Sequence, residues 1–492
     1  MQYVSTRQKS TIVTSSEAIV KGLSVDGGLF VPNDFPQITG QELSQMQDME
    51  YSERVAFVLS KFLSDFTIDE LKDYTAKAYS RFYGDDPCPL VAVADNTYIL
   101  ELWHGPTCAF KDMALTLLPH LMVASRKKVG ETNKTLILVA TSGDTGKAAL
   151  EGFKDVDGCE IIVFYPSEGV SDMQKLQMQT QEGNNVYVCG IKGNFDDAQS
   201  AVKVIFNDDN IKAELEKNGY KLSSANSINW GRLVPQIAYY VSSYVDLLAS
   251  DEIKMGDKIN FCVPSGNFGN ILAGYYAMRM GVPINKLICA SNKNRVLTDF
   301  FSSGKYDINR EFYKTMSPSM DILISSNLER LLFEISGRDD KYVASLMNDL
   351  KTKGFYEIDF AKLKENASNF EGGCSSEEMT MDTIENFYDE YDYLLDTHTA
   401  VAVNVYQKYN NYNTKTVIVS TASPYKFPQD VYNALTGEFV EDSIKATEML
   451  EEYTGVEIPE PLQGLQSRVV RFKDVIEKDK IKDAVLNAIK NK

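Results

Sequence analysis

Residues 135–146 read Thr-Leu-Ile-Leu-Val-Ala-Thr-Ser-Gly-Asp-Thr-Gly, an apolar run that leads into a loop of glycine and small polar residues. The run shows little alternation of polar and apolar positions, which is typical of a strand covered on both faces of a parallel sheet. A segment with helical spacing of its apolar residues, 147–153, follows the loop. Strand, glycine loop and helix in this order predict one unit of an α/β fold.

The same rhythm recurs along the chain. Strands are predicted at 160–165, 185–191, 258–263, 286–290 and 416–420, and helices at 113–128, 195–207 and 271–280. At about 100–200 residues per domain, a chain of 492 residues is expected to hold several units. We expect an N-terminal domain (1–95), an α/β domain (96–255, with a smaller mobile part at about 130–250), a second α/β domain (256–450, with a helical insertion at about 300–395) and a C-terminal helical tail (451–492).

Composition excludes several classes of protein. The chain carries 50 Lys and Arg against 69 Asp and Glu, a net charge of −19, which disfavours binding to nucleic acid or to an anionic membrane. No apolar run approaches the roughly 20 residues that a membrane span needs. The three histidines are scattered, so we expect no histidine metal site. The seven cysteines never form Cys-x-x-Cys, and the N-terminus shows no export signal, so we expect a cytoplasmic protein with reduced cysteines.

The loop at 141–146 has the properties of an anion site. Its glycines allow a sharp turn that exposes backbone N–H groups, and the following helix places its positive end there. The Walker A pattern fails, because the glycine spacing differs and Ala148 follows Lys147. Asp144 disfavours a dianionic phosphate, which leaves a single carboxylate as the better ligand. An ordinary turn whose Ser or Asp caps the helix is the alternative.

A second loop of the same kind, residues 264–270, reads Pro-Ser-Gly-Asn-Phe-Gly-Asn between a predicted strand and helix. It contains no acidic residue, so it suits a phosphate better than the first loop. A glycine turn with an Asn cap is again the alternative. Both loops follow the carboxyl ends of parallel strands, where ligands bind in open α/β sheets.

Residues 105–115 read Gly-Pro-Thr-Cys-Ala-Phe-Lys-Asp-Met-Ala-Leu and place Lys111 among apolar neighbours at a helix start. A cation opposes the helix dipole there, and burial lowers the pKa of a lysine. Both effects favour the free amine that Schiff-base chemistry requires. The alternative is a lysine whose ammonium group extends to solvent.

Three weaker candidates complete the set. The strand at 416–420 ends in hydroxyl residues, and Ser420 or Thr421 can hydrogen-bond a ring nitrogen or cap the next turn. Arg232 follows a polar loop and is either a phosphate ligand or a surface ion-pair partner. His398 is interpreted as a capping or core histidine rather than a base.

The three segments around Lys111, 141–146 and 265–270 resemble the fold-type II pyridoxal-phosphate enzymes. More narrowly, the chain resembles the threonine synthases of the bacterial and fungal branch. The narrower resemblance rests on motifs in chain order: Tyr3-Val-Ser-Thr-Arg7, Asp26-Gly-Gly-Leu-Phe-Val-Pro32, His104-Gly-Pro-Thr107, Phe110-Lys-Asp112, Ser265-Gly-Asn-Phe-Gly269, Ser317-Pro-Ser-Met-Asp-Ile322 and Ser420-Thr-Ala-Ser-Pro424.

The resemblance implies a fold like that of the tryptophan synthase β subunit, with two doubly wound parallel-sheet domains and an N-terminal α+β domain. It implies pyridoxal 5'-phosphate as cofactor. The implied reaction converts O-phospho-L-homoserine and water to L-threonine and phosphate, by γ-elimination and addition of water at the β carbon, as the last step of threonine biosynthesis. It also suggests a monomer.

The resemblance further implies a role for individual residues. Lys111 would hold the cofactor and move protons. The cofactor phosphate would bind Gly266, Asn267, Phe268, Gly269 and Asn270, and the pyridine nitrogen would face Thr421, or Ser420 if the strand is shifted. The substrate carboxylate would bind Ser142, Gly143 and Thr145, and the substrate phosphate Arg232, with Lys426 second. Many relatives have Asn at position 144, so Asp144 either caps the helix or is protonated, and its role stays open.

Three rival functions remain at this stage. One is another fold-type II lyase, such as a serine or threonine dehydratase or an O-acylserine β-replacement enzyme. A second is a binding protein that keeps the fold without activity, which the intact Lys111 and both loops oppose. A third is a nucleotide-binding kinase, which the failed Walker pattern disfavours.

Overall fold

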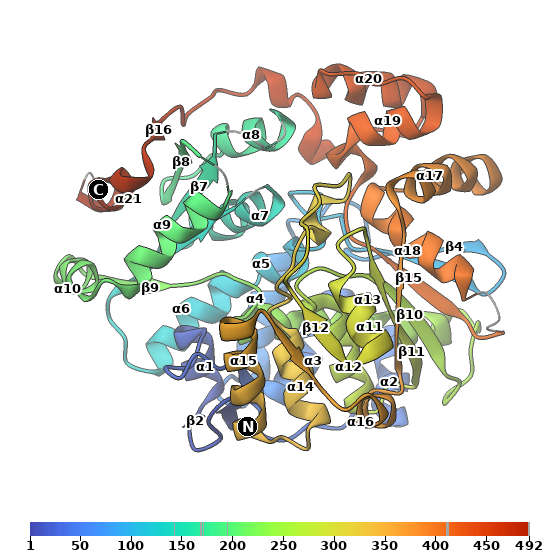
Figure 1. The fold of residues 1–492 in the computed structure, drawn as a ribbon, viewed down its shortest axis with the longest axis horizontal. Helices are drawn as coiled ribbons and strands as arrows, with labels where there is room; N and C mark the ends of the chain where they lie inside the picture. The colour runs from blue at the N-terminus through green and yellow to red at the C-terminus, as the bar shows by residue number, and fades with distance from the viewer. Residues whose placement is uncertain (142, 168–169, 171, 194, 410–412, 491–492) are drawn as a thin grey trace.

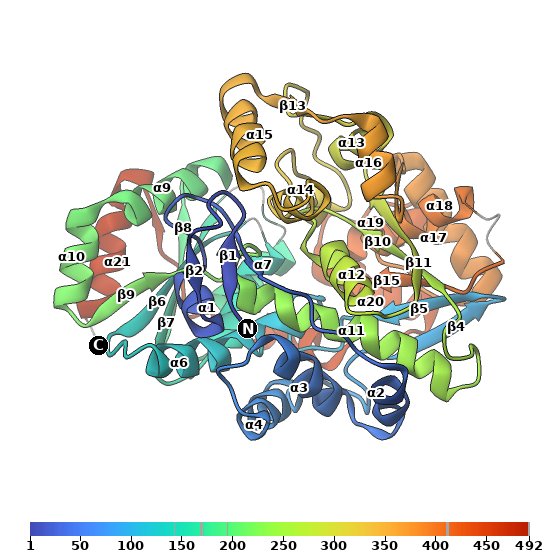
Figure 2. The same ribbon diagram turned by 90° about the horizontal axis from the view of Figure 1, so that it is seen from below.

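The computed structural model describes residues 1–492 except 142, 168–169, 171, 194, 410–412 and 491–492. Two mainly parallel sheets, one of six strands and one of five, form its framework. Figure 2 shows them on opposite sides of the molecule, with the N-terminal helices below and between them. Ser142 lies outside the described residues, so its predicted role has no structural account.

The six-stranded sheet has the order β14-β11-β10-β15-β5-β4. All neighbours are parallel except β4 and β5, which form an antiparallel pair at one edge. The strands are β4 (Leu90–Ala94), β5 (Thr97–Glu101), β10 (Ile259–Pro264), β11 (Ile284–Ser291), β14 (Phe370–Cys374) and β15 (Thr416–Ser420). The central strands are buried throughout, which is why their sequences are continuously apolar.

The five-stranded sheet has the order β16-β8-β7-β6-β9 and is parallel throughout. Its strands are β6 (Lys134–Ala140), β7 (Cys159–Pro166), β8 (Val186–Ile191), β9 (Tyr220–Ser223) and β16 (Val475–Ile476). Three of them lie within a residue or so of the predicted runs. The alternation with helices α7 (Asp144–Phe153), α8 (Asp172–Gln179), α9 (Phe195–Asn207) and α10 (Asp209–Lys217) is the predicted one.

Helix α11 (Trp230–Ala249) joins the two sheets. Most of its side chains are buried on all faces, and it packs against α6 (Leu118–Lys128) beside one sheet and α12 (Gly269–Arg279) beside the other. It also contacts α3 (Tyr51–Phe62) of the N-terminal region. A helix that is apolar all round is expected to lie inside a large protein, and here it fixes both sheets to one core.

The N-terminal region pairs a small antiparallel sheet with four helices. The sheet has the order β2-β1-β3, from Ile12–Val13, Tyr3–Ser5 and Phe30–Pro32. Three helices, α1 (Ser15–Lys21), α2 (Gly40–Gln45) and α4 (Ile68–Tyr79), begin with a Thr-x-x-Glu capping box. Each box satisfies two backbone N–H groups at a helix start, so these short helices are specified locally.

The predicted helix at 113–128 is two helices, α5 (Asp112–Leu115) and α6. Pro119 has no N–H to donate to the carbonyl of Leu115, so an unbroken helix would lose that bond. The Leu115 carbonyl instead lies against Gly152 of α7, where an added Cβ would come within 2.1 Å of the carbonyl oxygen. The break therefore allows close packing of α5 on α7, just after Lys111.

The region 300–395 is less helical than expected. It contains α13 (Val296–Ser303), α14 (Leu328–Ile335), α15 (Asp340–Lys353), α16 (Phe360–Asn366) and α17 (Glu377–Tyr391), but also the hairpin β12 (Lys305–Asp307) and β13 (Phe355–Glu357) and the sheet strand β14. The sequence of β14, Phe-Glu-Gly-Gly-Cys, lacks β-branched residues. Its glycines lie against Thr298 and Val405, so close approach of neighbours accounts for them.

The C-terminal segment crosses from one sheet to the other. Helix α18 (Thr397–Lys408) packs on the six-stranded sheet, α19 (Pro428–Thr436) packs on α17, and α20 (Ser443–Thr454) packs on α19 and α8. The chain then runs to β16 and α21 (Ile481–Lys490) at the edge of the five-stranded sheet (Figure 1). The amide of Gly190 donates to the carbonyl of Asp474 at 2.8 Å. The segment after 451 is thus not only a helical tail, because it supplies a strand.

Candidate functional site

Lys111 lies in the loop after β5, directly before α5, and is 8 % exposed. The loop is held by Asp112, whose carboxylate accepts from the amide of Thr107 at 2.8 Å and from its hydroxyl at 2.7 Å. The amide of Phe110 donates to the carbonyl of Thr421 at 2.8 Å, which ties the loop to the end of β15. The backbone around the lysine is therefore fixed from both sides.

The amine of Lys111 faces three groups. Nζ lies 3.2 Å from Oγ of Ser319, to which it donates, 3.7 Å from Oδ2 of Asp144 and 5.5 Å from the ring centre of Phe110. Burial is the main cause that lowers the pKa of Lys111 from its usual value, against an opposing pull from Asp144. The site therefore makes the amine of Lys111 easier to deprotonate than that of an exposed lysine, which is the predicted direction. The helix that follows has only four residues, so burial rather than a helix dipole is the cause.

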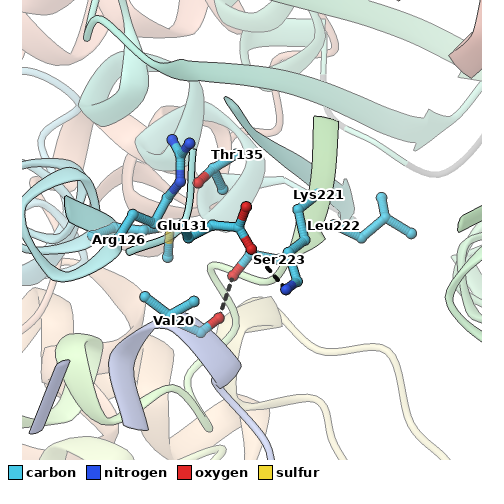
Figure 3. Close-up of a pocket in the computed structure, with 8 residues that line it drawn as sticks. Val20, Arg126, Glu131, Thr135, Lys221, Leu222 and Ser223 are labelled. Atoms are coloured by element: carbon cyan, nitrogen blue, oxygen red, sulfur yellow. Dashed lines mark hydrogen bonds and ion pairs between the residues drawn. The ribbon is translucent and has the colours of Figure 1, made fainter. Parts of the chain in front are cut away.

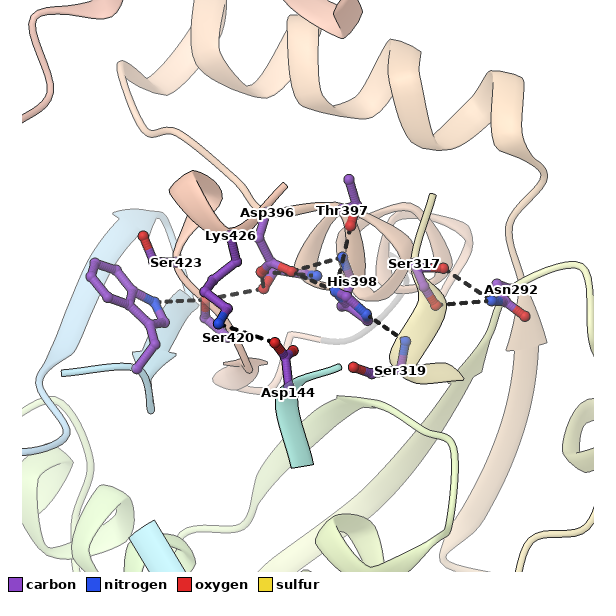
Figure 4. A network of polar contacts seen from close by, with 12 residues as sticks. Asp144, Asn292, Ser317, Ser319, Asp396, Thr397, His398, Ser420, Ser423 and Lys426 are labelled. Atoms are coloured by element: carbon purple, nitrogen blue, oxygen red, sulfur yellow. Dashed lines mark hydrogen bonds and ion pairs between the residues drawn. The ribbon is translucent and has the colours of Figure 1, made fainter. Parts of the chain in front are cut away.

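Asp144 begins α7 and is buried between two lysines. Its Oδ1 lies 3.1 Å from Nζ of Lys426 (Figure 4) and accepts from the side-chain Nε2 of Gln174 at 3.2 Å. Burial alone would raise the pKa of Asp144, but the charges of Lys426 and Lys111 hold that pKa well below its usual range. The carboxylate neither caps the helix nor takes up a proton; it neutralises Lys426.

The rest of the first loop is partly closed to ligands. The hydroxyl of Thr141 accepts from the amides of Gly143 and Gly146, each at 3.0 Å, and donates to the carbonyl of Gly143. The predicted Gly143 amide donor is thus already bonded. Thr145, the other predicted carboxylate ligand, is half-buried in the first turn of α7.

The second loop keeps its backbone amides available. The carbonyl of Gly266 accepts from the hydroxyl of Ser325 at 2.7 Å, and that of Asn267 accepts from the amide and side chain of Asn327 at 3.1 and 3.0 Å. In a trans peptide the N–H points opposite to the C=O, so the amides of Asn267 and Phe268 point away from these partners. Phe268 is in the left-handed region, with φ 62°, and Gly269 opens α12.

Asn270 offers an unused donor at this helix start. Its Oδ1 accepts from the hydroxyls of Tyr239 and Tyr240, both at 2.7 Å. Its Nδ2 is buried and finds no hydrogen-bond partner among the described residues. A buried amide without a partner is unfavourable by about 1–3 kcal/mol, so this atom indicates a ligand. Backbone amides, a helix start and this amide fit a phosphate group.

The end of β15 distinguishes the two hydroxyl candidates. The hydroxyl of Ser420 accepts from the indole of Trp103 at 3.1 Å and from the hydroxyl of Thr399 at 3.0 Å. Thr421 follows the last residue of β15, and its carbonyl accepts from the amide of Phe110 in the Lys111 loop. The Ser420 hydroxyl is already bonded twice, so Thr421 is the better candidate to meet a bound ring.

Arg232 and Lys426 differ in whether a carboxylate pairs with their positive charge. Arg232, in the first turn of α11, is 5 % exposed and donates to the carbonyl of Ala225 at 2.9 Å; no carboxylate of the described residues forms an ion pair with it. Burial lowers the pKa of Arg232 to about 10, which leaves it charged at neutral pH. Lys426 is already bound to Asp144 and, at 2.8 Å, to Gln177. Arg232 is the better anion ligand.

Sequence reasoning missed Ser319 as a contact of Lys111 and interpreted His398 as a capping or core residue. His398 is buried in α18, but its Nε2 accepts from the amide of Ser319 at 3.1 Å (Figure 4). Ser319 belongs to the motif 317–322, which the resemblance includes without a role. No local pattern links it to a lysine 208 positions away.

Other parts of the described chain offer weaker sites. No group of three or more His, Cys, Asp or Glu among these residues can hold a metal ion, and no described helix could cross a bilayer. Figure 3 shows a hollow between α6 and β9, where Lys221 and Glu131 pair at 2.7 Å and Ser223 donates to the Val20 carbonyl. These charges are already paired, so the hollow is not a candidate site.

Comparison with known proteins finds related families along most of the chain. Three family descriptions match the chain: Threonine synthase N terminus at residues 2–79, Pyridoxal-phosphate dependent enzyme at 89–423, and Threonine synthase, C-terminal at 399–485.

Individual relatives cover most of the chain. Threonine synthase-like 1 of Homo sapiens is 40 % identical over 439 residues, 87 % of this chain and 59 % of that protein. This chain thus spans about three fifths of that relative's length. Threonine synthase of Pseudomonas aeruginosa is 38 % identical over 89 % of this chain and 91 % of its own. The crystal structure of threonine synthase from Brucella melitensis with bound pyridoxal phosphate superposes with a TM-score of 0.89 at 38 % identity, covering 99 % of both chains.

Proposed function

The chain belongs to the threonine synthase family of pyridoxal-phosphate-dependent enzymes, and we propose that it converts O-phospho-L-homoserine and water to L-threonine and phosphate. The observation that carries the proposal is the buried amine of Lys111, 3.7 Å from Asp144 and beside a loop with free phosphate donors. Expectations from sequence for family, fold class and cofactor are confirmed by the comparisons.

The residues suit the cofactor. Pyridoxal phosphate, when bound, supplies a ring that withdraws electrons from the α carbon of an amino acid. The amides of Gly266, Asn267, Phe268, Gly269 and Asn270 would hold its phosphate, with the side chain of Asn270 as a further donor. The hydroxyl of Thr421 would meet the pyridine nitrogen without protonating it. Lys111 would carry the cofactor through its amine.

Lys111 also moves the protons of the reaction. A neutral amine accepts the proton from the α carbon, and the same nitrogen then transfers protons at the β and γ carbons. A lowered pKa brings the amine closer to the working pH, which makes both directions of transfer accessible. Phosphate leaves from the γ carbon, and water adds at the β carbon.

The substrate's two anionic ends need separate sites. The substrate phosphate would bind Arg232, whose buried guanidinium has no carboxylate partner among the described ion pairs. The carboxylate would bind the loop at 141–146 through Ser142 and Thr145, because the predicted donor of Gly143 already donates to the Thr141 hydroxyl. Asp144 would hold the amine of Lys426 in place beside this loop through their ion pair.

Product analysis tests the proposal directly. Purified protein with pyridoxal phosphate should release equal amounts of L-threonine and phosphate from O-phospho-L-homoserine, and Lys111→Ala should abolish both. Borohydride should fix the cofactor to the wild type only. Turnover of serine, threonine or O-acetylserine in the absence of threonine formation would favour the rival lyases, and a wild type without bound cofactor would favour a binding protein.

We also propose that the protein is a cytoplasmic monomer. We propose four domains, at 1–95, 96–255, 256–450 and 451–492, of which the part at about 130–250 closes when substrate binds. Light scattering after gel filtration should give the mass of one chain. Hydrogen exchange should slow around 130–250 when substrate is added to the Lys111→Ala variant. The mass of a dimer would contradict the proposed monomer, and unchanged exchange would contradict the proposed closure of 130–250.

A further inference from the structure

A histidine outside the predicted site holds the residue that contacts Lys111. His398 lies in the first turn of α18 and is 2 % exposed. Its Nε2 accepts from the amide of Ser319 at 3.1 Å, and its Nδ1 lies 2.9 Å from Oδ1 of Asp396 (Figure 4). The ring thus connects the N-terminal end of α18 to the segment Pro318–Met320.

The donors in this chain of contacts are fixed. A backbone N–H can only donate, so Nε2 of His398 must be the unprotonated nitrogen. Nδ1 then carries the proton and donates it to Asp396. Asp396 is the N-cap of α18 and also accepts from the amides of His398 and Thr399, at 2.8 and 3.3 Å, and from the Thr399 hydroxyl. One tautomer of the ring satisfies every partner.

Ser319, whose backbone is held by His398, contacts the amine of Lys111 directly. Its hydroxyl accepts from Nζ of Lys111 at 3.2 Å, and its carbonyl lies where a Cβ on Gly266 would come within 2.7 Å. The segment 318–320 is a single short turn, in which Met320 donates to the carbonyl of Ser317. The amide of Ser319 is held in turn by its bond to Nε2 of His398.

We propose that His398, oriented by Asp396, is a positioning residue that fixes the Ser319 hydroxyl against Lys111. This inference rests on the proposed role of Lys111. A neutral amine has two N–H bonds and one lone pair, so a fixed acceptor on one N–H restricts where the lone pair points. Ser319 on one side and Asp144 on another leave the lone pair free to point into the site, toward an aldehyde or a substrate proton.

Two substitutions of His398 separate its two bonds. His398→Asn keeps an amide donor near the Nδ1 position and removes the acceptor for Ser319. His398→Gln has a carbonyl that reaches the Nε2 position. The measurement is the rate at which apoenzyme condenses with added pyridoxal phosphate, followed by absorbance, with kcat and KM on O-phospho-L-homoserine as the second readout.

We expect His398→Asn to slow condensation about 10-fold, as loss of one hydrogen bond predicts, and to lower kcat with little change in KM. Ser319→Ala should do the same, and the double variant should be no slower than either. His398→Gln should stay within about threefold of wild type. Asn404→Ala removes a contact from α18 to Thr383 at 3.2 Å, and it should leave condensation unchanged.

A double variant whose rate falls by the product of the two single effects would overturn the proposal, because His398 would then act independently of Ser319. Asn404→Ala as slow as His398→Asn would also overturn it, because His398 would then act on α18 as a whole. Wild-type rates in both His398→Asn and Ser319→Ala would overturn it as well. If His398→Asn fails to fold, Ser319→Ala alone must slow condensation. The condensation rate does not depend on which substrate is turned over, so it tests this inference even if threonine is not the product.

Discussion

In the loop after β6, the Thr141 hydroxyl takes the amides of Gly143 and Gly146, and Asp144 is matched by Lys426. In the loop after β10, the carbonyls are bonded outward to Ser325 and Asn327, and Asn270 keeps a buried amide without a partner. Both loops join a parallel strand to a helix and contain glycine and small polar residues. The difference teaches that glycine content by itself does not show which backbone donors of a loop remain available to a ligand.

The largest effect is expected from breaking the charge pair of the first loop. Asp144→Asn leaves Lys426 buried without a counter-charge, and removal of one partner of a buried pair destabilises a protein by about 3–5 kcal/mol. Urea unfolding of the apoenzyme should show this as a lower midpoint. The double variant Asp144→Asn/Lys426→Gln should recover most of it; a double variant less stable than the single one would contradict the pairing.

The second loop should be sensitive to shape instead. In Gly266→Ala the new Cβ would lie 2.7 Å from the carbonyl oxygen of Ser319, a backbone atom that cannot rotate away. We expect the affinity for pyridoxal phosphate to fall about 100-fold, by displacement of the loop. Gly269→Ala is the matched control, since its Cβ would meet only the Asn327 side chain at 3.3 Å. Equal affinities of the two variants would show that the loop is not rigid.

The unpaired amide of the second loop should contribute less. Asn270→Leu removes the donor, and a hydrogen bond to a charged group contributes about 1.5–3 kcal/mol, so the dissociation constant of pyridoxal phosphate should rise about 30-fold. Asn267→Ala, an exposed neighbour, should change it less than threefold. Equilibrium titration of apoenzyme measures both. An unchanged constant in Asn270→Leu would place the phosphate elsewhere.

The smallest effect concerns two buried aspartates near Lys111. Burial raises the pKa of Asp112 to about 6, although two bonds from Thr107 lower it in part, whereas cations hold the pKa of Asp144 below its usual range. An unfolded Asp titrates near 3.9, so the folded protein binds more protons around Asp112 and its stability falls as pH rises from about 4 to 6.

Between pH 5 and 7 this loss should be about 1 kcal/mol. The Asp112→Asn variant lacks the titrating group, so its stability relative to wild type should rise by that amount over this range. Urea midpoints at the two pH values measure the difference. The opposite slope would mean that the Thr107 bonds dominate over burial.

Local pattern was sufficient for the elements that depend on local physics. The strands β6, β7 and β10 are continuous apolar runs, and both glycine loops lie where these runs end. The sequence prediction failed in two ways. The break before α6 has a local signal, Pro119, that the prediction of one helix over 113–128 did not use. In β14 no local signal exists, because its glycines fit against Thr298 and Val405 of other elements.

The same limit applies to the site. Lys111 and Asn270 lie in motifs that predict chemistry by themselves. The roles of Ser319 and His398 become visible only in the structure, where Ser319 contacts both His398 and Lys111 from a segment far away in the chain. Hydroxyl and imidazole groups in such positions have no local signature, so sequence reasoning interpreted His398 as structural.

The order of strands in the six-stranded sheet has a consequence for synthesis. β15, at residues 416–420, lies between β10 and β5, so the two strands that flank Lys111 and the phosphate loop cannot join until residue 420 has left the ribosome. β10 ends at Pro264, so about 156 further residues must be made before β15 is complete. At roughly 5–20 residues per second, the nascent chain waits about 8–30 seconds with two apolar strand edges open. During that interval the growing polypeptide is a natural client for chaperones that cover such edges.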